Sequence, residues 1–409
     1  MNFFDDKIAE RLGGTSFGKN DVIYKFEMIK RAKRAAQEAF PDRPIIDMGV
    51  GEPDWAADRG VVETLSQEAG KLENRWYADN GIPEFQKAAA DYMSSIYGVS
   101  DLNYEAEIVH GIGSKPILAM LPICLINPGD FLIQTVPGYP VMATYTKYLG
   151  GEVYDLPLNE ENDFFPDLES IPPNVLEKAK VLYMNYPNNP TGQVATKEFF
   201  EKVVAFAKKH NIAVVNDAAY AGVVFGDYAP LSFLSIDGAK DIGIEVHSMS
   251  KSFNMTGWRL AFVAGNEKFV SAYAAVKDNS DSGQFRAIQK SAIYALNHPE
   301  ITKATCEKYS RRFDMLVEAL CEIGFDAKKP QGTFYCYVKA PTGANGVKLE
   351  NASAASKYLI ENASISTVPW DDAGPHLRFS VTFEADTIEK EKEIIDEMKN
   401  RLKKLNLTF

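Results

Sequence analysis

The sequence predicts an α/β protein with a large domain, whose mostly parallel sheet is covered by helices on both faces, and a smaller α+β domain. Three observations support this. The chain has 409 residues, more than one small core requires. From about residue 108 onward, short and wholly apolar runs alternate with amphipathic stretches, a pattern typical of parallel strands buried on both faces. The last hundred residues abandon this alternation, which indicates a second domain.

The elements follow in order along the chain. The first forty residues predict an arm followed by a basic helix. In the large domain, the predicted strands cover 131–134, 180–185, 212–217 and 260–265, and the predicted helices cover 139–149 and 197–210. A long helical region over 299–323 precedes two strands at 332–338 and 377–381.

These elements divide the chain into three segments. Residues 1–48 form the arm and part of the small domain, 49–295 the large domain, and 296–409 the small C-terminal domain. The small domain thus combines the N- and C-terminal segments. We expect the second break near residues 290–298, inside a long helix.

Composition excludes several classes of partner. The formal charge of −12 argues against binding to nucleic acid or to anionic membranes, which recruit basic surfaces. No apolar run is long enough to span a bilayer, and the N-terminus lacks a signal pattern, so we expect a cytoplasmic protein. The four cysteines are scattered and none of the five histidines shows ligand spacing, which predicts reduced thiols and no metal site.

The most informative stretch is the run 248–259, in which Lys251 lies among small hydroxyl residues. A lysine that forms a Schiff base must lose its proton readily, and a nearby cation such as Arg259 lowers its pKa. The hydroxyl groups of Ser248 and Ser250, with the Arg259 guanidinium, suit a phosphate dianion. Taken alone, however, the same pattern is common in solvated loops.

Other polar residues follow predicted strands, where open parallel sheets bind ligands. The glycine turn 110–115 opens a helix, so its backbone N–H groups suit a phosphate. The run 185–192 is equally consistent with a rigid turn. Asp217 ends a strand after apolar residues, and a carboxylate persists there more easily when it faces a cation. Tyr220 follows three residues later.

These pieces occur in the order found in the fold-type I, pyridoxal-phosphate-dependent aminotransferases, which the chain resembles from the run 49–54 to Arg378. The resemblance implies that Lys251 forms the Schiff base with pyridoxal 5′-phosphate and later shuttles a proton. It implies that Asp217 faces the pyridine nitrogen of the cofactor. Asn189 and Tyr220 match the pair that hydrogen-bonds its phenolic oxygen.

The resemblance also assigns the periphery of the site. Tyr139 matches the aromatic residue that stacks on the cofactor ring, although it reads equally as a core tyrosine. Arg378 matches the clamp for the substrate α-carboxylate, and Tyr77 matches a tyrosine that the neighbouring subunit contributes, which implies a homodimer with shared active sites. The implied phosphate cup comprises Gly113, Ser114, Ser248 and Arg259, with Lys115 beside it, and the implied substrate contacts include Gly51 and Asn189.

A closer resemblance is to the LL-diaminopimelate aminotransferases, carried by the runs 12–19, 23–26, 46–54 and 77–82. The substrate of that family carries a second ammonium and a second carboxylate at its distal end. The resemblance implies that Asp79 contacts this distal ammonium, that Lys115 reaches the distal carboxylate, and that Tyr24 closes over the substrate. Plant-type relatives have glutamate at the position of Asp79, so the side chain here is one methylene shorter. The plant-type asparagine from the other subunit has no secure equivalent; the nearby polar residues are Asn279 and Ser282.

The expected function is LL-diaminopimelate:2-oxoglutarate aminotransfer in lysine biosynthesis, with tetrahydrodipicolinate as acceptor and glutamate as donor. Its small-molecule partners are thus amino acids and 2-oxo acids. The alternative is an aspartate, alanine or aromatic aminotransferase, in which Asp79 and Lys115 are ordinary surface charges. A non-catalytic regulator that binds the cofactor is more remote, since Lys251 is intact and the arm before residue 49 is short for a DNA-binding segment.

Overall fold

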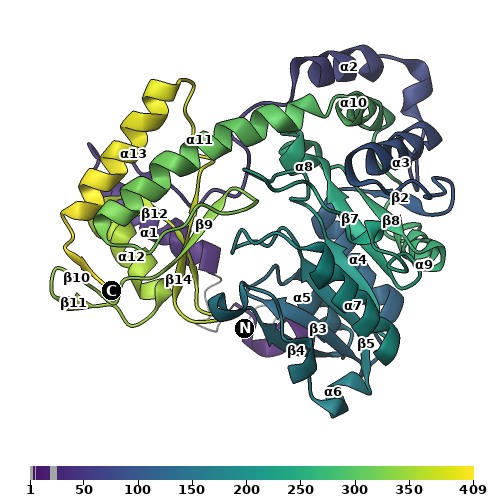
Figure 1. Ribbon diagram of the computed structural model, residues 1–409, viewed down its shortest axis with the longest axis horizontal. Coiled ribbons are helices and arrows are strands. Elements are labelled where there is room, and N and C mark those ends of the chain that lie inside the picture. The colour runs from purple at the N-terminus through teal and green to yellow at the C-terminus, as the bar shows by residue number, and fades with distance from the viewer. Residues whose placement is uncertain (1–2, 5, 19–24) are drawn as a thin grey trace.

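The computed structural model describes residues 3–4, 6–18 and 25–409 (Figure 1). Tyr24, expected to close over the substrate, lies outside these residues. The described chain forms a larger α/β part and a smaller α+β part, as the sequence predicts.

The larger part is organised around a seven-stranded sheet. All neighbouring strands pair in parallel except β8, which lies antiparallel between β2 and β7. The mostly parallel sheet predicted from the sequence is therefore confirmed. In spatial order the strands are β2 (Ile108–Gly111), β8 (Ala261–Gly265), β7 (Gly243–Ser248), β6 (Ala213–Asp217), β5 (Ala179–Asn185), β3 (Phe131–Val136) and β4 (Glu152–Pro157).

Helices cover both faces of this sheet because successive strand residues point to opposite sides. In β6, Val214 belongs to one apolar cluster and Val215 to the other. The first cluster includes side chains of α2 (Arg59–Ala69), α3 (Pro83–Tyr97), α7 (Lys197–His210) and α10 (Arg286–Leu296). The second includes side chains of α4 (Ser114–Leu125), α5 (Val141–Tyr148) and α9 (Glu267–Lys277).

The smaller part joins both ends of the chain. From the two ends of the sequence, β1 (Ile46–Asp47) and β12 (Ile365–Ser366) pair in parallel. A three-stranded antiparallel sheet has the order β13 (Val368–Trp370), β14 (His376–Ser380) and β9 (Tyr335–Lys339). The helices of this part are α1 (Lys25–Ala39), α11 (Glu300–Ile323), α12 (Ala352–Ala363) and α13 (Ile388–Lys403), and its short strands are β10 (Gly343–Ala344), β11 (Val347–Lys348) and β15 (Leu407–Thr408).

The region between the two parts consists of two helices, α10 and α11, separated by residues 297–299, and not of one long helix. Figure 1 shows α11 running from the end of α10 across to α13. Its early residue Ile301 packs against the core of the larger part, whereas Tyr309 and Phe313 belong to the core of the smaller part. The boundary predicted at residue 295 stays a prediction, because α11 contributes to both cores.

Candidate active site

The strand order of the sheet gathers the predicted site residues at one edge. Strands β2, β5, β6 and β7 point the same way, so their carboxyl ends share one side of the sheet. Asn185 pairs with Asp217, and Asp217 pairs with Val246, two residues before Ser248. The polar turns that follow these strands therefore meet in the position where open α/β sheets bind ligands.

Asp217 is a buried carboxylate at the centre of this edge, with 5% of its surface exposed. Its Oδ1 accepts a hydrogen bond from the Ala219 amide at 3.2 Å, and its Oδ2 accepts one from the Tyr183 hydroxyl at 3.4 Å. Burial nevertheless raises the pKa of Asp217 to about 6, because few groups replace the lost water. A cation placed against this carboxylate would favour its ionised form.

Lys251 lies on the short helix α8 (Met249–Ser252), directly after β7. Its Nζ donates a hydrogen bond to the carbonyl of Gly51 at 2.6 Å and lies 5.5 Å from the centre of the Phe334 ring. Burial lowers the pKa of Lys251 to about 8, and the charges of Arg378 and Arg259 act in the same direction. The amine is thus prepared to act as a nucleophile near neutral pH.

A cradle for an anion forms where α4 begins. Gly113 has φ of 84°, and a Cβ on this residue would lie 2.2 Å from Nη2 of Arg259, so only glycine admits the guanidinium here. Ser114 opens α4, and Arg259 Nη1 donates to Ser250 Oγ at 3.5 Å. Ser248 instead caps α8, its Oγ accepting from the Ser250 amide at 3.2 Å.

Arg378 of β14 is the cation on the opposite side of the site and is also buried. Its Nη1 donates to Oδ1 of Asn189 at 2.9 Å, and its Nη2 donates to the Gly49 carbonyl at 3.2 Å. The guanidinium lies 3.8 Å from the centre of the Tyr335 ring. Its buried Nε has no hydrogen-bond partner among the described residues, so the side chain retains capacity for an anionic ligand.

Tyr335 and Tyr183 are site residues that the sequence analysis missed. The Tyr335 hydroxyl lies 3.0 Å from the Tyr220 hydroxyl, and a Cβ on Gly51 would approach it to 3.0 Å. Both tyrosines lie in predicted strands, where an aromatic residue reads first as core. Only the contact of Tyr335 with Tyr220, which follows β6, distinguishes Tyr335 from such a residue. Tyr139 is half-buried near Tyr183, whose pKa is raised well above its ordinary value by burial and then by the charge of Asp217.

The residues predicted for the distal end of the substrate, Asp79 and Lys115, and Tyr77, predicted for the partner's cofactor phosphate, lie at the exposed rim. Asp79, Lys115 and Tyr77 are all exposed, Tyr77 by 77%. In the part of the chain that the structure describes, no hydrogen bond or ion pair joins the side chain of Asp79 or Lys115 to Lys251 or Arg378. The Asp79 carbonyl accepts a hydrogen bond from the buried amine of Lys277, so its backbone is fixed.

Comparison with known proteins agrees with this arrangement. The family described as aminotransferase class I and II matches residues 43–394. The chain belongs to the class I and II aminotransferases. It is thus a pyridoxal-phosphate-dependent enzyme of amino acids and 2-oxo acids. Two observations fit the cofactor: the cradle of Gly113 and Arg259 suits its phosphate, and the buried Asp217 suits a cationic ring nitrogen.

Individual aminotransferases align over nearly the whole chain. An LL-diaminopimelate aminotransferase of Methanocaldococcus jannaschii is 55% identical, covering 100% of this chain and 99% of its own length. One of Dehalococcoides mccartyi is 40% identical, over 88% of this chain and 93% of its own. A substrate-bound structure of BacF from Bacillus subtilis superimposes with a TM-score of 0.86 at 36% identity, over 95% of this chain and 97% of that one.

The described residues lack two further features. None of their helices combines the length and apolar character needed to cross a membrane. Within the same residues, no three histidine, cysteine, aspartate or glutamate side chains are grouped so that they could hold a metal ion.

Proposed function

We propose that the enzyme transfers the amine of glutamate to the acyclic form of tetrahydrodipicolinate, giving LL-diaminopimelate and 2-oxoglutarate in lysine biosynthesis. The observation that carries this proposal is the 55% identity, over the full length of this chain, to a relative named LL-diaminopimelate aminotransferase. The family alone would equally allow an aspartate, alanine or aromatic aminotransferase.

The reaction centre consists of Lys251 and Asp217. Pyridoxal 5′-phosphate, when bound, withdraws electrons from the α-carbon of the amino acid. Asp217 keeps a negative charge against the ring nitrogen and so favours its protonated form. Lys251 would hold the cofactor through a covalent link, and its Nζ would carry the proton removed from the α-carbon. Its lowered pKa of about 8 leaves a useful fraction of neutral amine near neutral pH.

The surrounding side chains bind and orient. Gly113, Ser114, Ser248 and Arg259 hold the phosphate, with Lys115 at its edge, while Asn189 and Tyr220 hydrogen-bond the phenolic oxygen and Tyr139 stacks on the ring. Arg378 holds the substrate α-carboxylate beside Asn189 and the backbone of Gly51, because its Nε is buried and available. Two parallel charge-assisted bonds would then fix the orientation of the α-carbon.

The distal recognition site requires a second subunit. The proposed enzyme is a cytoplasmic homodimer in which Tyr77 reaches the partner's phosphate and Asp79 binds the distal ammonium, with Lys115 on the distal carboxylate. The exposure of Tyr77 and of its neighbours Trp76 and Leu72, 57% and 71% exposed, supports this interface. Three large apolar side chains so close together are unusual on a free surface.

The test is a substrate comparison with the purified enzyme. LL-diaminopimelate, meso-diaminopimelate and aspartate are each offered with 2-oxoglutarate, and tetrahydrodipicolinate or glutamate formation is followed. We expect kcat/KM to be highest for LL-diaminopimelate. A preference for aspartate would overturn the substrate assignment while leaving the enzyme class intact.

A further inference from the structure

The segment 49–54, which follows β1, touches the candidate site through its backbone. The carbonyl of Gly51 accepts a hydrogen bond from Lys251 Nζ at 2.6 Å, and the carbonyl of Gly49 accepts one from Arg378 Nη2 at 3.2 Å. The carbonyl of Val50 between them accepts from the Thr382 hydroxyl at 3.0 Å. The position of this segment therefore influences both the proposed Schiff-base lysine and the proposed carboxylate clamp.

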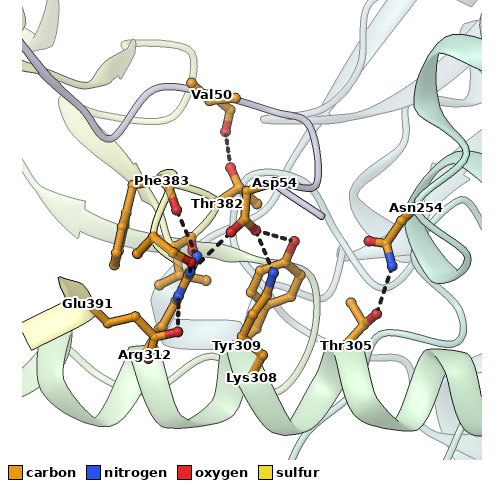
Figure 2. Close-up of polar contacts among 12 residues, drawn as sticks. Val50, Asp54, Asn254, Thr305, Lys308, Tyr309, Arg312, Thr382, Phe383 and Glu391 are labelled. Carbon is orange, nitrogen blue, oxygen red and sulfur yellow. Dashed lines mark hydrogen bonds and ion pairs between the residues drawn. The ribbon is translucent and has the colours of Figure 1, made fainter. Parts of the chain in front are cut away.

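Asp54 anchors the far end of the segment to helix α11. Its Oδ1 accepts hydrogen bonds from Lys308 Nζ at 2.7 Å and from the Tyr309 hydroxyl at 3.1 Å, and its Oδ2 pairs with Arg312 Nη2 at 3.0 Å. The Asp54 side chain is only 2% exposed. Figure 2 shows the carboxylate enclosed by these three side chains. Such a fully paired buried charge has a well-defined position.

The anchor itself is held in place by the smaller part of the protein. Arg312 is fully buried, and its Nη1 donates to the carbonyls of Val381 and Phe383, each at 2.8 Å. Its Nε donates to Oε1 of Glu391 on α13 at 2.8 Å. These contacts do not involve Asp54, so the guanidinium is preorganised to receive it (Figure 2).

The same helix contacts the segment that carries Lys251. The Thr302 hydroxyl donates to the carbonyl of Ser252 at 2.9 Å, and Asn254 Nδ2 donates to the Thr305 hydroxyl at 3.1 Å. Residues 302, 305, 309 and 312 are three or four positions apart and share one face of α11. This face thus holds the lysine segment at one end and the segment 49–54 at the other.

We propose that Asp54 is a positioning residue, which through Lys308, Tyr309 and Arg312 keeps the carbonyls of residues 49 and 51 aligned with Arg378 and Lys251. The inference rests on the proposed roles of Arg378 and Lys251. Asp54 itself does not contact either side chain, so its effect passes through the backbone of the segment. The alternative is that the buried ion pairs of Asp54 with Lys308 and Arg312 affect only the stability of the fold.

The test compares Asp54→Asn with Glu391→Gln in the holoenzyme. Both changes remove a buried carboxylate that pairs with Arg312, but Glu391 does not touch the segment 49–54. The measurements are the melting temperature, the hydrogen exchange of the amides of residues 46–52, and KM and kcat with glutamate. Tyr309→Phe, which removes one hydrogen bond and no charge, is the second variant should Asp54→Asn fold poorly.

For Asp54→Asn we expect amide exchange in 46–52 to accelerate by about tenfold or more, since local opening becomes easier. KM for glutamate should rise about tenfold with a smaller change in kcat, because the Arg378 contact is made in bound substrate and transition state alike. Tyr309→Phe should raise the exchange rate and KM as well, but by less. Glu391→Gln should lower the melting temperature while leaving the exchange rate of 46–52 and KM unchanged, because Arg312 Nη1 still donates to the carbonyls of Val381 and Phe383.

Two results would overturn the inference. If Asp54→Asn or Tyr309→Phe lowers the melting temperature with unchanged exchange and KM, the carboxylate serves stability alone. If Glu391→Gln raises KM as much as Asp54→Asn, the effect belongs to the whole charge cluster. Hydrogen exchange and the glutamate measurements do not require diaminopimelate, so failure of the substrate assignment remains distinguishable.

Discussion

The carboxyl edge of the sheet and the rim formed by residues 76–82 differ in how deeply their predicted site residues are buried within one chain. At the sheet edge, Asp217 and Arg378 are buried and Lys251 is half-buried, and the pKa values of Asp217 and Lys251 are displaced toward neutrality. At the rim, Tyr77 and Asp79 are exposed and make no side-chain contact with the buried group. We propose that a single chain fixes the reaction chemistry, whereas the selection of a substrate involves surfaces that a second subunit completes.

The largest effect is expected at the buried edge, from Lys251→Ala. A positioned proton-transfer group typically contributes about 10²–10⁴-fold, so turnover should fall by about a thousandfold, the middle of this range, or about 4 kcal/mol. The variant should still bind pyridoxal 5′-phosphate through the cradle of Gly113 and Arg259, but borohydride should no longer fix it covalently. Turnover, absorbance and mass after reduction are measured together. Activity within tenfold of the wild type would remove Lys251 from the mechanism.

Asp217→Asn tests whether the buried carboxylate acts on the reaction or only on the fold. Removing one preorganised electrostatic group from an active site costs about 10²–10³-fold, so we expect kcat to fall about a hundredfold, or about 3 kcal/mol. The loss should appear in kcat because the interaction strengthens as charge develops on the substrate. A decrease of less than about tenfold would mean that Asp217 does not face the cofactor ring.

The position of Asp217 could be predicted from the sequence, because it ends a predicted apolar strand and the carboxyl ends of parallel strands share one edge. The strand that precedes Lys251, β7, was not predicted, because Glu245 and His247 interrupt its apolar residues. The reversed direction of β8 could not be predicted, because apolar character marks a strand without indicating its direction. The family resemblance, and not the strand pattern, identified Arg378, and its role stays a prediction.

Contacts between distant segments escaped the sequence analysis for a different reason. Asp54 and Arg312 are separated by more than 250 residues, and their pairing depends on how α11 crosses from one part to the other. Neither residue stands out locally, since Lys308, Arg311 and Arg312 read as the solvated face of a charged helix. The role of Tyr77 stays a prediction, because its proposed contacts belong to another subunit.

The pH dependence of stability gives a second measure of the buried edge. Without cofactor, burial raises the pKa of Asp217 from 3.8 to about 6. Because the pKa of Asp217 is higher in the folded than in the unfolded state, its contribution to the free energy of unfolding is fully present below pH about 4. This contribution is lost as the pH rises through about 6. Cofactor-free protein should therefore lose up to about 3 kcal/mol of unfolding free energy over this window.

Urea unfolding of the cofactor-free wild type and Asp217→Asn at pH 4.5, 6 and 7.5 measures this term, because subtracting the variant removes the contribution of other carboxyl groups. The difference in unfolding free energy should change progressively in favour of the variant as pH rises. A difference that stays constant with pH would mean that the carboxylate is well solvated or already paired.

The smallest of these effects is expected at the rim, from Asp79→Ala, and it concerns specificity. LL-diaminopimelate carries an ammonium and a carboxylate at its distal end, whereas glutamate carries only a carboxylate there. Removing one partner of a desolvated charge pair costs about 2–5 kcal/mol, so kcat/KM for diaminopimelate should fall by about thirtyfold or more. The half-reaction with glutamate, followed by the loss of cofactor absorbance, should change far less.

The control is Asp278→Asn, which alters another exposed carboxylate beside the rim: Asp278 follows α9 and accepts a hydrogen bond from Asn80 at 2.8 Å. This change perturbs the support of the rim without removing the proposed distal ligand, so it should affect both substrates alike. Equal losses for both substrates in Asp79→Ala would place that residue in the same supporting role. Selective loss of diaminopimelate activity would instead locate substrate choice at the rim, on a side chain that lies outside the buried chemistry of its own subunit.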